Sequence, residues 1–167
     1  MTKNSGWLLL SLYLGTLVWI LLFKFSISLS DLSALHNQSR SLNLIPFSQS
    51  GIVNHTLDWS EIIANVIIFL PFGLLLRAIS NLSITKSVSL IFGFSLVIEM
   101  LQFVFSLGAT DVTDLLMNTL GGILGLGLYA SLAHFIPTKR LNQWLIYTGT
   151  LLFAIAFGLL VFLLVVN

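Results

Sequence analysis

Five long apolar runs are the feature that most limits what this chain can fold into. They cover residues 7–23, 62–76, 88–105, 115–135 and 144–166. A helix of roughly 20 apolar residues spans the hydrocarbon core of a bilayer. With 8% charged residues and a mean hydropathy of +1.03, the chain could not cover a soluble domain with polar surface. The sequence therefore predicts an all-α membrane protein, a bundle of about five transmembrane helices in a single domain over residues 1–167.

The remaining composition excludes several classes of function. The chain has no cysteine, so it can form neither a disulfide nor a thiolate metal site. Its formal net charge of +1 gives no reason to expect a nucleic-acid partner. The first apolar run ends at Lys24 without a small-residue cleavage site, so we expect a retained helix rather than a signal peptide.

Basic residues predict how the helices are oriented. With the N-terminus in the cytoplasm, the inside bases are Lys3, Arg77, Lys86, Lys139 and Arg140, and the outside bases are Lys24 and Arg40. The one long loop, residues 24–59, is then outside. Every acidic residue lies outside as well, except Glu99, which falls within the third run. Because acidic residues contribute little to topology, this asymmetry indicates a functional reason.

Polar residues recur at helical spacing within the third run. Ser95, Glu99, Gln102 and Ser106 lie four, three and four residues apart, which places them on one face of a helix. If this helix runs outward, Glu99 lies about 12 Å below its outer end, at 1.5 Å per residue. The third run therefore carries a polar stripe inside the membrane.

Two other helices bring polar groups to the same depth. The fourth run begins with Asp111, Asp114 and Asn118, again three and four residues apart, and Asn65 lies one turn beyond Glu61 in the second. Separate burial of these groups in lipid would cost several kcal/mol for each unpaired group. We therefore expect one cavity, open to the outer face, that is shared by Glu99, Asp111, Asp114 and Asn118, with Gln102 and Asn65 on its wall.

Each of these residues also has a purely structural explanation. Asp111 and Asp114 stand where a carboxylate caps the first amides of a helix. The side-chain amides of Asn65, Gln102 and Asn118 could instead link membrane helices by hydrogen bonds. Glu99 differs, because a carboxyl group at that depth is costly unless it is protonated, paired or hydrated, and such residues usually serve function.

Small residues and proline predict how the helices pack. Gly121 and Gly125 form a GxxxG pair, which allows a neighbouring backbone to approach closely. Pro71 removes a helical hydrogen bond, so we expect a kink of the second helix near Gly73.

The outer loop contains an apolar segment, "NLIPFS", over residues 43–48. Its apolar side chains would not stay in water, so it either anchors the loop in the membrane interface or folds over the bundle as a lid. The same loop holds possible metal ligands, His36, His55 and Asp58, followed by Glu61, but their spacing matches no tight motif. We expect them to be solvated loop residues. No motif in the sequence identifies a particular cofactor or metal.

An ordered set of motifs resembles a known family. "NLIPF", "NVIIFLPFGLLL", "SLVIEMLQ" and "TDVTDLLMNTLGGILG" follow one another over residues 43–125, as in the VanZ-like family of bacterial membrane proteins. The resemblance implies a small polytopic protein of the cell membrane whose founding member is associated with resistance to the glycopeptide antibiotic teicoplanin. The family's polar signature then falls on Asn65, Pro71, Gly73, Glu99, Gln102, Asp111, Asp114, Asn118 and Gly121.

One departure from the family pattern bears on the ligand. Many members have an arginine shortly before the first aspartate, but residues 106–109 read "SLGA" here. An arginine clamp for phosphate or carboxylate would then depend on Arg40 from the outer loop. Without a base, the site suits a cation, or a sugar or peptide amide.

Three functions remain open. The first is binding or modification, at the outer face, of a lipid-linked envelope component or a lipoglycopeptide drug. If the protein is an enzyme, Glu99 is the general acid or base, and Asp111 and Asp114 orient the substrate or hold a divalent cation. The residues expected to bind the substrate are Asn65, Gln102, Asn118 and Arg40.

The second function is proton-coupled transport of a lipid or drug, which would use the intramembrane carboxyl group of Glu99. The third is a non-catalytic scaffold for another envelope protein, in which the GxxxG pair matters most. Polar residues that stop in the outer leaflet, without an inverted repeat, count against transport.

Overall fold

The computed structural model describes residues 3–23, 41–47, 52–53, 56–57, 59–107 and 109–166. Within these residues, five helices are long and apolar enough to cross a membrane. They are α1 (Lys3–Phe23), α3 (Trp59–Ile79), α4 (Ile84–Phe105), α5 (Val112–Phe135) and α6 (Thr138–Val166). The prediction of an all-α, multi-pass membrane protein with about five transmembrane helices is therefore confirmed.

The helices extend beyond the apolar runs that predicted them. α3, for example, begins at Trp59 and ends at Ile79, so it takes in Glu61 and Arg77 as well as residues 62–76. α4 begins after Ser83, whose side chain accepts a hydrogen bond from the amide of Lys86 over 3.4 Å. Hydropathy marks only the part of a helix within hydrocarbon, whereas polar caps and turns extend the helix into the interface.

The packing of α3 against α5 is the closest in the bundle, and it depends on glycine. A Cβ atom on Gly121 would lie 2.2 Å from the carbonyl oxygen of Val66, and one on Gly125 would lie 2.0 Å from that of Leu70. From the opposite side, a Cβ atom on Gly73 would lie 1.9 Å from the carbonyl oxygen of Gly122. The two backbones are therefore in direct contact, and the close approach predicted from the GxxxG pair is confirmed.

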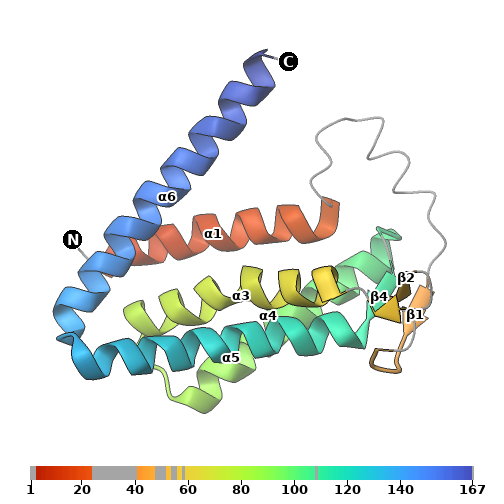
Figure 1. The fold of residues 1–167 in the computed structure, drawn as a ribbon, viewed down its shortest axis with the longest axis horizontal. Coiled ribbons are helices and arrows are strands. Elements are labelled where there is room, and N and C mark those ends of the chain that lie inside the picture. Colours follow the sequence, from red (N-terminus) through yellow and green to blue (C-terminus); the bar gives the residue numbers. More distant parts are fainter. Residues whose placement is uncertain are drawn as a thin grey trace.

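The other helices surround this pair (Figure 1). α1 is joined to α3 by the hydroxyl of Tyr13, which donates to the carbonyl oxygen of Ile68. Phe69 and Phe72 of α3 pack against Phe94 of α4 in the core. α6 packs on α1 and α3 near its beginning, and then diverges from the bundle at a steep angle (Figure 1). Most of α6 is consequently exposed, as expected for a helix surrounded by lipid.

Two pairs of short strands lie at one end of the bundle (Figure 1). β1 (Ser41–Asn43) pairs in parallel with β4 (Ala109–Asp111), and β2 (Ile52–Val53) pairs antiparallel with β3 (Thr56–Leu57). The sequence does not predict these strands, because segments of two or three residues are too short for a pattern of alternation. The β1–β4 pair nevertheless positions the candidate site.

Candidate functional site

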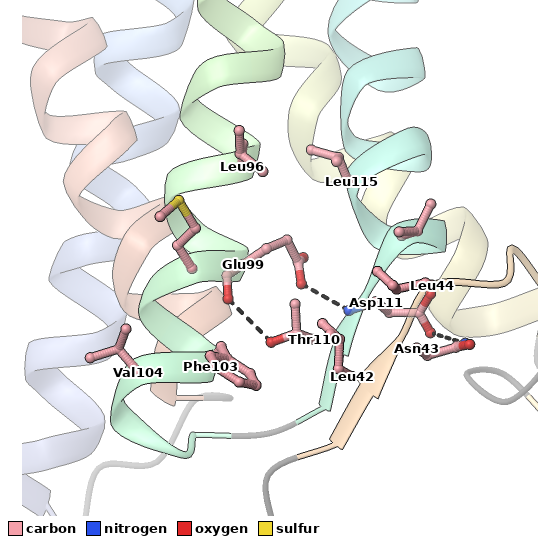
Figure 2. Close-up of a pocket in the computed structure, with 12 residues that line it drawn as sticks. Leu42, Asn43, Leu44, Leu96, Glu99, Phe103, Val104, Thr110, Asp111 and Leu115 are labelled. Atoms are coloured by element: carbon pink, nitrogen blue, oxygen red, sulfur yellow. Dashed lines mark hydrogen bonds between the residues drawn. The ribbon is translucent and has the colours of Figure 1, made fainter.

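Glu99 lies near the C-terminal end of α4, and only 4% of it is exposed. Its Oε2 atom accepts a hydrogen bond of 3.0 Å from the backbone amide of Asp111. The hydroxyl of Thr110 donates over 3.2 Å to the backbone carbonyl of Glu99 (Figure 2). Two successive residues of β4, Thr110 and Asp111, therefore donate hydrogen bonds to Glu99 of α4. No hydrogen bond within the described residues engages the other carboxylate oxygen of Glu99.

Both carboxylate oxygens of Asp111 accept hydrogen bonds within the site. One oxygen accepts from the amide of Thr113 over 2.6 Å, which makes Asp111 the N-cap of α5. The other accepts from the side-chain amide of Asn43 over 3.0 Å. Asp111 is 1% exposed, so both of its oxygens are satisfied inside the protein. The structural explanation offered for Asp111, helix capping, is thus what the geometry shows.

Asn43 belongs to this site, although the sequence pattern did not single it out. It is 6% exposed, and its side chain joins β1 to β4 across 68 residues of sequence. Its position at the start of "NLIPF" was the available signal, but an isolated asparagine in a loop has no periodicity. Only the parallel pairing of β1 with β4 places its side chain against Asp111.

Residues 41–47, which we call the strap, fold over the beginning of α5. Besides the β1–β4 pairing, the amide of Phe47 donates to the hydroxyl of Thr113 over 3.0 Å. Leu44, Ile45 and Phe47 nevertheless expose their side chains, by 64%, 68% and 41%. The strap therefore folds over the bundle, as the prediction of a lid requires. It also exposes apolar side chains, as the prediction of an interfacial anchor requires.

A pocket of about 310 Å³ lies between the strap and α4. The polar residues of its lining are Glu99, Asp111, Thr110 and Asn43 (Figure 2). The other lining residues are apolar: Leu42 and Leu44 of the strap, Leu96, Met100, Phe103 and Val104 of α4, and Val112 and Leu115 of α5. The pocket therefore combines a buried carboxylate with a wall of hydrocarbon.

The other polar residues are divided among separate contacts. The amide of Asn65 donates to Asp114 over 2.7 Å, and this bond joins α3 to α5. The amide of Asn118 donates to the hydroxyl of Ser95 over 3.0 Å, and this bond joins α5 to α4. Both asparagines are buried, at 7% and 1% exposure. These contacts are the interhelical hydrogen bonds offered as the structural alternative.

Gln102 lies on a different side of α4. Its amide donates to the backbone carbonyl of Leu21 in α1, over 3.0 Å. Of the groups expected to share one cavity, Glu99 and Asp111 line the pocket, whereas Asp114, Asn118, Asn65 and Gln102 are not among its lining residues. Helical spacing predicts a shared face, but a face about 100° wide contacts more than one neighbouring helix.

Charge is distributed unevenly between the two ends of the bundle. Glu99, Asp111 and Asp114 lie at the end that carries β1 and β4, and the two aspartates interact electrostatically with Glu99. The bases within the described side chains, Arg77, Lys86, Lys139 and Arg140, lie at the opposite end, at the α3–α4 and α5–α6 connections. Arg40, His36, His55 and Asp58 lie outside the described residues. Within the described part, no group of three or more His, Cys, Asp or Glu side chains could hold a metal ion.

An apolar bundle of five helices with an acidic pocket at one end defines the class: a small multi-pass protein of the cell membrane. The family model described as VanZ/LLP1 matches residues 10–135. The chain is also 42% identical over 145 residues to Protein VanZ of Enterococcus faecium, and this match covers 86% of the chain and 85% of that protein. The chain therefore belongs to the VanZ/LLP1 family, and the resemblance found in its motifs is confirmed. No solved structure matches it.

Proposed function

We propose that this protein acts at the outer face of the bacterial membrane, where it binds or modifies a lipid-linked envelope component or a lipoglycopeptide drug, and that it thereby gives tolerance to teicoplanin. The observation that carries the proposal is the pocket that combines Glu99 with apolar walls. A carboxylate is expensive to bury in a membrane and usually serves function when it faces a cavity. The outer location rests on the distribution of basic residues, which assigns this end to the outside.

The contacts suggest different roles for the three carboxylates. Glu99 lines the pocket, so it is the residue that would contact the ligand and, in a reaction, exchange a proton with it. Asp111 would act as a positioning residue, because its oxygens already hold the strap and α5. Asp114 and Asn65 would support the site by fixing α3 to α5.

Arg40 is the remaining candidate for ligand binding. It is next in sequence to Ser41, the first residue of β1, which pairs with Ala109 of β4. Arg40 itself lies outside the described residues. Its contribution is best measured as Arg40→Gln beside the Glu99 variant.

Glu99→Gln is the direct test of the proposal. Glutamine keeps an oxygen that can accept from the amide of Asp111 but removes the charge and the exchangeable proton. Glu61→Gln is the matched control, because Glu61 is exposed near the same end of the bundle. In cells with matched membrane levels of each variant, Glu99→Gln should lose teicoplanin tolerance and Glu61→Gln should retain it. Tolerance that survives Glu99→Gln would refute the proposed role of the pocket.

A scaffold for another envelope protein is a second candidate, favoured by α6. Gly121 and Gly125 contact α3 of the same chain and so cannot receive a partner helix. α6, by contrast, exposes a long apolar surface that includes Leu152, Ile155 and Leu159. Tolerance that is lost when these three residues are changed to alanine, but kept in Glu99→Gln, would favour the scaffold.

A further inference from the structure

The strap, residues 41–47, has the features of a segment that lies within the membrane. We propose that its apolar side chains, Leu44, Ile45 and Phe47, are inserted into the lipid of the leaflet that holds this end of the bundle. The partner of this surface is therefore bilayer lipid, not water or another protein. Insertion of the strap is separate from the proposed function, and we expect it whichever side of the membrane this end faces.

The strap runs from the end of the bundle toward its middle. β4 lies between the end of α4 and the start of α5, so it leads back along α4. β1 is parallel to β4 and runs the same way, from the end of α4 to the level of Glu99 (Figure 2). Leu44, the residue after β1, lines the pocket together with Leu96 of α4. The strap therefore does not extend away from the bundle as a surface loop would.

Glu99 marks the depth that the strap reaches. The amide of Asp111 donates to the Glu99 side chain over 3.0 Å, and the hydroxyl of Thr110 donates to the Glu99 carbonyl over 3.2 Å. The register of the strands places Asn43 opposite Asp111. Glu99 lies six residues before Phe105, the last residue of α4, which is about 9 Å at 1.5 Å per residue. The inner end of β1 is thus well within the length of α4.

This part of α4 lies in hydrocarbon. Lys86 is exposed near the start of α4, and a charged side chain marks the edge of the hydrocarbon core. Phe105 lies 19 residues beyond Lys86, about 28 Å at 1.5 Å per residue. Because the hydrocarbon core is about 30 Å thick, it covers α4 as far as Phe105. Val104 and Phe105 are apolar and 57% and 53% exposed, as contact with lipid requires. The strap, which reaches deeper than these residues, lies at the same level as lipid.

The apolar surface of the strap is continuous with the lipid-facing surface of α4. Residues 44–47 are all apolar and all exposed. Leu42 and Leu44 line the same pocket as Met100 and Val104, which are exposed on a helix long and apolar enough to span the membrane. An exposed apolar patch that joins a membrane-spanning surface contacts the same lipid. This continuity favours lipid over a separate protein partner.

The backbone of the strap is also suited to hydrocarbon. The amide of Ile45 donates to the side-chain oxygen of Asn43 over 3.2 Å, and the amide of Phe47 donates to the hydroxyl of Thr113 over 3.0 Å. Pro46, between them, has no amide hydrogen. In lipid, backbone outside a helix must find its hydrogen bonds within the protein, whereas a loop in water can bond to solvent. The amides at the tip of the strap meet this requirement.

Spin labelling tests the insertion, because the chain has no cysteine and each introduced cysteine is unique. The purified full chain with a nitroxide on Ile45→Cys is reconstituted into phosphatidylcholine liposomes. Collisions of the label are measured with oxygen, which concentrates in hydrocarbon, and with a water-soluble nickel chelate. Val97→Cys, at a position 53% exposed on α4, is the lipid reference. Asn81→Cys, in the exposed α3–α4 connection, is the water reference.

The ratio of oxygen to nickel collisions at Ile45 should approach the ratio at Val97 and exceed the ratio at Asn81 several-fold. Leu44→Cys should give the same result, and it replaces Ile45→Cys if that variant does not fold. A ratio equal to that at Asn81 would show that the strap lies in water. Few collisions with either reagent would show that protein covers it. Either of these outcomes would overturn the proposal, and neither depends on whether Glu99→Gln loses teicoplanin tolerance.

Discussion

Replacing Gly125 with alanine should destabilise the bundle far more than the same change at Gly127. Both glycines lie in α5, two residues apart, but Gly125 is buried against α3 and Gly127 is exposed. A Cβ atom on Gly125 would lie 2.0 Å from the carbonyl oxygen of Leu70, whereas one on Gly127 meets no atom within 4 Å. Comparing Gly125→Ala with Gly127→Ala therefore separates the effect of the close contact from the higher helix propensity of alanine.

The magnitude follows from this distance. Real Cβ atoms essentially never approach another heavy atom within 3.0 Å, so α5 and α3 must separate by about 1 Å along their central contact. The atom in the way is backbone, which cannot rotate aside, and overpacking of this kind costs about 1–3 kcal/mol. At Gly127 the change instead favours the helix by roughly 0.5–1 kcal/mol.

Thermal unfolding of the purified variants in one detergent measures the difference. For a chain of this size, each kcal/mol changes the melting temperature by roughly 2–4 °C. Gly125→Ala should therefore melt several degrees below the parent protein, and Gly127→Ala at or slightly above it. If the two variants melt at the same temperature, α3 and α5 are not in backbone contact and the packing described for them is wrong.

Three further predictions address orientation, the cap of α5 and the attachment of α6. Reporter fusions at Asn81 and Asn142 should read cytoplasmic and one after Val166 external; an external signal at Asn81 would reverse the topology and move the pocket to the inside. Asp111→Ala should lower the free energy of unfolding by about 2–4 kcal/mol, because it removes the N-cap of α5 and the carboxylate that accepts from the buried side-chain amide of Asn43; a loss below about 0.5 kcal/mol would contradict these contacts. Tyr129→Phe removes a 2.6 Å hydrogen bond to the side chain of Asn142 and should cost about 0.5–1.5 kcal/mol in thermal unfolding, so an unchanged melting temperature would refute that bond.

Glu99 shows how far sequence reasoning reaches at the site. Its depth within an apolar run was sufficient to single it out, because the cost of burying a carboxyl group is a property of its surroundings along the chain. Its partner, the backbone amide of Asp111, comes from a strand of three residues with no recognisable pattern. Gln102 shares the helical stripe of Glu99 but contacts α1, because the stripe faces two neighbours rather than one cavity.

The sequence by itself predicted the five spans, their orientation in the membrane, and the close approach of another helix to Gly121 and Gly125; the structure identified that helix as α3. These features depend on local quantities: the length of an apolar run, the side on which bases lie, and the spacing of small residues. Only the tertiary structure decided which polar groups meet. The parallel pairing of β1 with β4 joins Asn43 to Asp111, uses both oxygens of that aspartate, and leaves Glu99 as the carboxylate that faces the pocket. The physical reason is that a hydrogen bond depends on the distance and direction of its partner, and residues 68 positions apart have no such relation until the chain has folded.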